Sequence, residues 1–201
     1  MATKYWDRVG RVGRGRDFRG SKGRAELRRL AEAALQLKPG DRVLDIGCGS
    51  GPDLEMLRDA VGGEGFVLAI DASEVMVKHA KARVDAAGWD NVEVRHADAT
   101  TLTVEGFDAA LSIFTVSATP DVRATLVYAR AALRPGGRLY VMDLRLADST
   151  PLNRVFRLAY RVFARWTGVD VLETARFVFD TVEVPDRLPS WPPVVAFTAI
   201  R

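Results

Sequence analysis

Three glycines at alternate positions follow a short apolar run in the stretch VLDIGCGSG, residues 43–51. Glycine lets the backbone turn tightly and approach a ligand that a Cβ atom would repel. Asp71 lies 20 residues beyond Gly51, at the end of the next strand-like run. A carboxylate at that place can accept hydrogen bonds from both hydroxyls of a ribose. These residues therefore predict a binding site for a ligand that contains a nucleoside.

Two classes of enzyme fit a glycine loop followed by such an acid: nicotinamide-dependent oxidoreductases and methyltransferases. The spacing here is GxGxG, which lacks the third glycine of the dinucleotide pattern GxGxxG. A second acid, Asp98 in the stretch HADA, closes the third strand-like run, where the amino group of an adenine would lie. Asp98 has an alternative interpretation as an acid that only caps a turn. The spacing and the second acid favour the methyltransferase.

The elements that position these residues alternate along the chain. Short apolar runs typical of buried strands occupy 42–46, 65–70, 91–96, 107–113 and 138–143. Helical patterns begin at about residue 24 and lie near 52–61, 73–87 and 121–134. This alternation predicts βαβ units and a parallel sheet.

The C-terminal part follows a different pattern. Two strand-like runs, 177–184 and 193–200, are separated only by the turn-rich stretch PDRLPSWP. That connection is too short for a crossover helix, so these two strands are predicted to pair antiparallel. The result is a single α/β domain, with a mostly parallel sheet and a C-terminal hairpin.

The stretches VLDIGCGSG, AIDASEVM, HADAT and FDAALSI…LRPGGRLYVMD together resemble the class I S-adenosylmethionine-dependent methyltransferases. The resemblance is to the ubiquinone/menaquinone C-methyltransferases and the bacterial phospholipid N-methyltransferases. It implies a Rossmann-like three-layer sandwich with a seven-stranded, mostly parallel sheet. It also implies S-adenosyl-L-methionine as the cofactor and S-adenosyl-L-homocysteine as its product. The residues that it places at the cofactor are Asp45, Gly47, Cys48, Gly49, Gly51, Asp71, Ala72, Met76, Asp98, Ala99 and Phe114.

The acceptor is defined by weaker signals. The fourth strand-like run leads into FTVSATPD, residues 114–121, which departs from the tetrapeptide of enzymes that methylate adenine or glutamine amides. We therefore expect a small-molecule or amphiphilic acceptor, such as a lipid headgroup or a quinone-like ring. The polar candidates near it are Thr115, Asp143, Arg145 and Tyr160, and none is identified as a catalytic base. His96 fits a place on a sheet face better than the role of a base.

The stretch 151–166 contains four arginines on one helical stripe and no acid. A basic amphipathic helix of this kind can contact an anionic membrane surface or cap an amphiphilic acceptor. The alternative is a lid helix that packs on the domain with a solvated arginine face.

Residues 1–30 hold ten basic and three acidic side chains. We expect a basic, flexible arm over 1–23 and a methyltransferase domain over 24–201. An RNA methyltransferase that uses the arm, an NAD-dependent oxidoreductase and a non-catalytic cofactor-binding module are the alternatives, with nucleic acid the less favoured partner. One cysteine and two histidines argue against a metal site. The absence of an apolar leader or a membrane-spanning run predicts a cytoplasmic protein.

Overall fold

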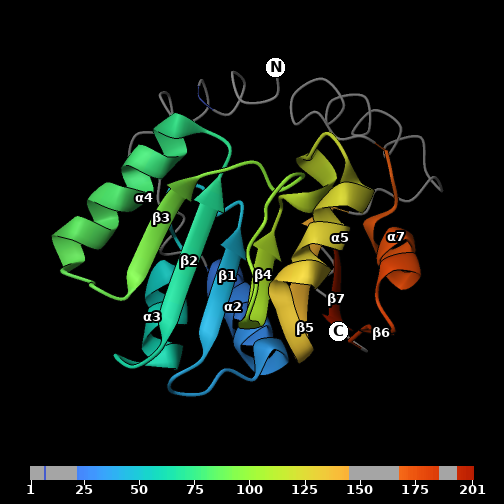
Figure 1. The fold of residues 1–201 in the computed structure, drawn as a ribbon, viewed down its shortest axis with the longest axis horizontal. Helices are drawn as coiled ribbons and strands as arrows, with labels where there is room; N and C mark the ends of the chain where they lie inside the picture. The colour runs from blue at the N-terminus through green and yellow to red at the C-terminus, as the bar shows by residue number, and fades with distance from the viewer. Residues whose placement is uncertain (1–6, 8–21, 145–167, 186–193) are drawn as a thin grey trace.

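A computed structural model describes Asp7 and residues 22–144, 168–185 and 194–201 (Figure 1). Seven strands form one sheet in the order β3-β2-β1-β4-β5-β7-β6. The strands are β1 Arg42–Ile46, β2 Phe66–Asp71, β3 Val92–His96, β4 Phe107–Ile113, β5 Leu133–Leu144, β6 Thr181–Glu183 and β7 Val194–Ile200. The seven-stranded sheet expected from the sequence is confirmed.

The direction of the strands fixes where a ligand can bind. Neighbouring strands from β3 to β5 pair parallel, whereas β7 pairs antiparallel with both β5 and β6. The predicted antiparallel C-terminal hairpin is therefore confirmed. The carboxyl ends of the parallel strands meet at one edge of the sheet, which is the edge where such folds bind their ligands.

Helices cover both faces of the sheet and make a three-layer sandwich (Figure 1). Their bounds are α2 Lys22–Leu35, α3 Leu54–Val61, α4 Glu74–Ala87, α5 Val122–Ala132 and α7 Val171–Val178. One apolar cluster joins α2, α3 and α4 to alternate residues of the strands, among them Val43, Val67 and Leu111. The other cluster joins α5 and α7 to the opposite face, through residues such as Leu44 and Leu139. This alternation follows from the period of two in a strand.

The strand predicted over 177–184 is wrong in its first half. Residues up to Val178 belong to α7, which begins after Asp170, whose side chain accepts a hydrogen bond from the Glu173 amide at 3.1 Å. Helical spacing buries Val171, Leu172 and Ala175, so tertiary packing outweighs the β-propensity of the run that follows. Phe177 is 87% exposed, which a buried strand would not allow.

The stretch Pro135-Gly136-Gly137 lies within an irregular part of β5. The pairing with β4 steps from Phe107↔Leu133 to Ala109↔Arg138, so extra residues bulge out of β5. Gly136 has a φ of 78° and donates to the Arg201 carbonyl at 2.6 Å. The bulge thereby pairs with the C-terminal residue of the chain.

Tyr140 gives a first stability prediction. Its side chain is 2% exposed within the cluster under α2, and its hydroxyl has no hydrogen-bond partner among the described residues. Because burying such a hydroxyl is unfavourable, Tyr140→Phe should raise the free energy of unfolding by about 1 kcal/mol. Urea denaturation at neutral pH measures this change.

The same substitution has a distinct alkaline signature. Burial raises the pKa of Tyr140 to about 12, from 10.0 for a solvated tyrosine. A folded-state pKa above the unfolded value means that stability is present below pH 10 and is lost as the pH rises towards 12. The advantage of Tyr140→Phe over the wild type should therefore grow above pH 10. The prediction would be contradicted if Tyr140→Phe were less stable than the wild type both at neutral pH and above pH 10.

None of the helices in the described ranges combines the length and the apolar character needed to cross a membrane.

Candidate functional site

The glycine loop leaves β1 at the carboxyl edge of the sheet and folds over the end of β2. The amides of Gly47 and Cys48 both donate to the Ile70 carbonyl, at 2.8 and 2.9 Å. The three glycines Gly47, Gly49 and Gly51 have φ values of 74°, 56° and 75°, a region that residues with a side chain rarely adopt. The loop is therefore held by backbone contacts in a conformation that requires glycine.

Two of these glycines have different surroundings. A Cβ atom at Gly47 would lie 2.1 to 2.6 Å from the Thr115 side chain, which also donates a hydrogen bond to the Gly47 carbonyl at 3.2 Å. A Cβ atom at Gly49 would meet no atom of the described residues within 4 Å. Gly47 thus allows the loop to pack against the end of β4, whereas Gly49 borders open space that a ligand can fill.

Asp71 joins the glycine loop to the beginning of α4. Its Oδ2 atom accepts a hydrogen bond from the Gly49 amide at 2.9 Å, and its Oδ1 atom accepts one from the Ser73 amide at 2.8 Å. Burial raises the pKa of Asp71, against the opposing effects of these two amides and of the His96 charge. Each carboxylate oxygen has a further lone pair, so a bound hydroxyl can still reach it.

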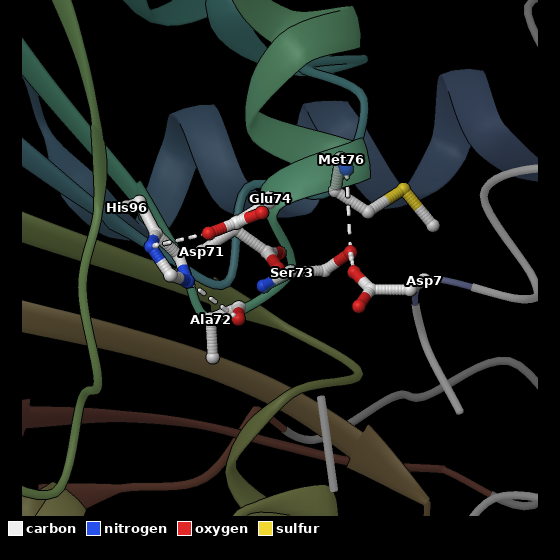
Figure 2. Close-up of polar contacts among 7 residues, drawn as sticks. All are labelled: Asp7, Asp71, Ala72, Ser73, Glu74, Met76 and His96. Carbon is white, nitrogen blue, oxygen red and sulfur yellow. Dashed lines mark hydrogen bonds and ion pairs between the residues drawn. The ribbon is translucent and has the colours of Figure 1, made fainter. Parts of the chain in front are cut away.

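The turn from Asp71 to Glu74 is held from two further sides (Figure 2). The Ser73 hydroxyl donates to Asp7 Oδ1 at 2.6 Å and accepts from the Met76 amide at 3.3 Å. Nε2 of His96 lies 2.9 Å from the Ala72 carbonyl, which assigns the proton to Nε2. His96 is the last residue of β3, and its ring reaches from there to this turn.

Asp98 lies exposed beyond the end of β3. Its Oδ1 atom accepts hydrogen bonds from the Thr100 amide at 2.8 Å and from the Thr100 hydroxyl at 2.7 Å. This is the geometry of an acid that caps its own turn, the alternative that the sequence left open. Both contacts use one oxygen, so the geometry is also compatible with a ligand at Oδ2.

Asp45 in β1 and Cys48 in the glycine loop are almost fully buried, with exposed fractions of 4% each. Burial and the nearby carboxylates of Asp45 and Asp71 raise the pKa of the Cys48 thiol well above its ordinary value. The thiol stays protonated at neutral pH, so Cys48 acts as a small packing residue of the loop and not as a nucleophile.

The end of β4 has an unusual backbone. Phe114 has a φ of 55° although it is not glycine, and its amide donates to the Met142 carbonyl at 2.8 Å. The conformation turns the chain towards the glycine loop, where Thr115 contacts Gly47. A strained backbone conformation persists only where the surrounding structure holds it, and such residues are often found at functional sites.

Asp143 was a candidate on the acceptor side, and it is fully buried at the end of β5. Its carboxylate accepts hydrogen bonds from the Ser117 amide at 2.8 Å and from the Ser117 hydroxyl at 2.5 Å. These two contacts with Ser117 hold the short 3₁₀ helix Val116–Ala118, which follows β4.

Comparison with known proteins identifies this arrangement. A family model described as a methyltransferase domain matches residues 43–137. A 2-phytyl-1,4-naphtoquinone methyltransferase of Synechococcus elongatus is 33% identical over 69% of this chain and 60% of its own length. The chain belongs to the class I S-adenosylmethionine-dependent methyltransferases. The resemblance noted in the sequence is thereby confirmed.

Solved structures agree with this methyltransferase fold. An S-adenosylmethionine-dependent methyltransferase from Aquifex aeolicus has a TM-score of 0.65 at 22% identity and covers 90% of this chain and 93% of its own. A phosphoethanolamine N-methyltransferase of Haemonchus contortus, in complex with S-adenosylhomocysteine, has a TM-score of 0.70 at 22% identity and covers 80% of this chain and 38% of its own. The chain spans about three fifths of the length of the quinone methyltransferases that it matches.

The predicted residues of the methyltransferase site come from four neighbouring strand ends. The loop after β1 carries the three glycines, Asp71 is the last residue of β2, and the segments after β3 and β4 carry Asp98 and Phe114. Ala72 and Met76 lie in the turn after β2 and in the first turn of α4, and Ala99 packs partly buried on the core. Arg145, Tyr160, the stretch 151–166 and residues 1–6 and 8–21 of the arm lie outside the described residues, whereas the last two residues of the arm, 22 and 23, belong to α2.

Sequence reasoning missed one member of the site and interpreted another only in part. Ser73 is the first residue of the helical pattern at 73–87 and caps α4, and its hydroxyl also contacts Asp7. The sequence does not point to Asp7, because it lies 66 residues from Ser73 and a single acid in a basic arm forms no pattern. Within the described ranges, no group of three or more His, Cys, Asp or Glu residues is placed to hold a metal ion.

Proposed function

We propose that this methyltransferase binds S-adenosyl-L-methionine at the carboxyl ends of β1 and β2 and transfers its methyl group to a small-molecule acceptor, with S-adenosyl-L-homocysteine as the product. The observation that carries the proposal is the contact between the Asp71 carboxylate and the Gly49 amide at 2.9 Å. It joins a glycine loop that borders open space to an acid suited to two ribose hydroxyls.

The residues present fit the cofactor. Asp71 would accept the ribose hydroxyls, and the open side of Gly49 would admit the methionine part. Asp45 would orient the loop, while Asp98 and the Ala99 amide would hold the adenine. Bound S-adenosylmethionine supplies an electrophilic methyl group on a sulfonium. The protein then needs chiefly to hold the acceptor in line with that methyl and to exclude water.

The class of acceptor is supported by the names of the relatives. They include quinone methyltransferases and an arsenite methyltransferase, which act on small molecules. We therefore favour a small or amphiphilic acceptor, either a quinone-like ring or a lipid headgroup, over RNA. An NAD-dependent oxidoreductase and a non-catalytic module are less well supported by the same relatives. Contact of 151–166 with an anionic membrane and a cytoplasmic location stay predictions from the sequence.

Calorimetric titration with S-adenosylmethionine, S-adenosylhomocysteine and NAD tests the cofactor. We expect the first two to bind and NAD to give no heat of binding. Radiolabelled methyl transfer to a demethylated naphthoquinone, to phosphoethanolamine and to RNA then tests the acceptor, with Asp71→Ala as the inactive control. Binding of NAD alone would overturn the proposal, and transfer only to RNA would overturn the small-molecule acceptor.

A further inference from the structure

Ser73 occupies a central place between two carboxylates. Its side chain is 1% exposed, its amide donates to Asp71 Oδ1 at 2.8 Å, and its hydroxyl donates to Asp7 Oδ1 at 2.6 Å (Figure 2). A buried hydroxyl proton needs an acceptor, and Asp7 supplies it. One residue thus connects the acid of the ribose site to an acid from the N-terminal end of the chain.

The hydroxyl of Ser73 has a second contact that makes its orientation matter. It accepts a hydrogen bond from the Met76 amide at 3.3 Å and so caps the N-terminus of α4. With its proton directed to Asp7, its lone pairs face the helix. If Asp7 were absent, the hydroxyl could rotate, and both the cap and the turn that carries Asp71 would lose one constraint.

We propose that Asp7 is a positioning residue of the cofactor site, which fixes the Ser73 hydroxyl and through it the turn that presents Asp71 to the ribose. The inference rests on the proposed cofactor site at Asp71. It assigns a role in cofactor binding to a residue that lies 66 positions before Ser73 in the sequence. Asp7 acts through Ser73 and need not touch the cofactor.

The charge of Asp7 provides an independent readout. Among the described residues, the charged or titratable groups that face Asp71 are Asp7, His96 at the end of β3 and Cys48 in the glycine loop. Behind them, Glu74 on α4 lies 4.0 Å from Nδ1 of His96, and Asp45 acts on Cys48. Asp7 raises the pKa of Asp71, whereas His96 lowers it. Because ribose binding needs ionised Asp71, affinity should fall as the pH drops through the pKa of Asp71.

The test compares Asp7→Ala and Asp7→Asn with the wild-type chain by calorimetry with S-adenosylmethionine. At neutral pH, Asp7→Ala should weaken binding about fivefold, since one buried hydrogen bond is lost. Asp7→Asn should stay within about twofold, because its amide oxygen can still accept the Ser73 proton. Over a range from about pH 4 to 8, both variants should move the midpoint of the affinity loss to lower pH.

A matched control is Asp85→Ala, which removes an exposed carboxylate at the other end of α4. It should change neither the affinity at neutral pH nor the midpoint of the affinity loss. Wild-type affinity in Asp7→Ala, or an unmoved midpoint in Asp7→Asn, would overturn the proposal. Asp71→Ala separates the two levels of the hypothesis. If it abolishes binding while Asp7→Ala does not weaken it, only the role of Asp7 fails. If Asp71→Ala binds normally, the cofactor site itself fails.

Discussion

Asp71→Ala should weaken the binding of S-adenosylmethionine by about 100-fold, because the ribose would lose both of its hydrogen bonds to a charged acceptor. The variant also frees the Gly49 and Ser73 amides, which now donate to the carboxylate at 2.9 and 2.8 Å. The loop and the turn after β2 would therefore lose their shared anchor. Isothermal titration calorimetry at neutral pH measures the change directly.

Folding should survive this substitution better than binding does. Burial raises the pKa of Asp71, so the ionised carboxylate is held in the fold against a cost of desolvation. Its removal relieves that cost while it breaks the two amide contacts, and thermal unfolding without cofactor should show only a modest shift. A large loss of stability would mean that the carboxylate is chiefly structural.

Asp98→Ala is the informative comparison for this experiment. Asp98 is exposed, and its carboxylate accepts hydrogen bonds within its own turn, from the amide and the hydroxyl of Thr100. One bond to the adenine amino group would be lost, so we expect a decrease in affinity of about tenfold. If Asp98→Ala weakened binding as much as Asp71→Ala, the prediction that Asp71 contributes more than Asp98 to cofactor affinity would be wrong.

The layers of this fold could be predicted because their signals are local. Runs such as 43–46 and 67–70 are buried on both faces of the sheet and therefore read as continuous apolar strands. The glycine loop and Asp71 were predictable for a related reason. A strand, a turn that needs positive φ and the end of the next strand occur at nearly fixed separations in this fold.

The features that escaped prediction depend on distant parts of the chain. The contact between Asp7 and Ser73 joins residues 66 positions apart, and a hydroxyl paired with a carboxylate leaves no periodic trace. The first half of 177–184 joins α7 because Val171 and Ala175 pack in the cluster of α5, a contact that a local β-propensity cannot anticipate. The role of Asp98 stayed open because one residue type serves both a turn and a ligand.

Gly47→Ala should destabilise the protein by about 2 to 5 kcal/mol, from the sum of backbone strain and overpacking. Its φ of 74° disfavours any side chain, and the new Cβ atom would lie 2.1 to 2.6 Å from Thr115. The end of β4 would have to move away from the loop. Chemical denaturation of the cofactor-free protein gives the free energy of unfolding.

Gly49→Ala is the matched control. It should lower the free energy of unfolding less than Gly47→Ala does, and it should weaken cofactor binding. Its φ of 56° costs about 1 kcal/mol, but the added Cβ atom meets no atom of the described part of the chain within 4 Å. The methyl group would instead occupy the space proposed for the cofactor and weaken its binding. Combining Gly47→Ala with Thr115→Gly should recover part of the lost stability, because the clashing side chain is gone. Equal destabilisation by the two alanine variants, without any recovery in the double variant, would show that the loop is not packed against β4 through Gly47.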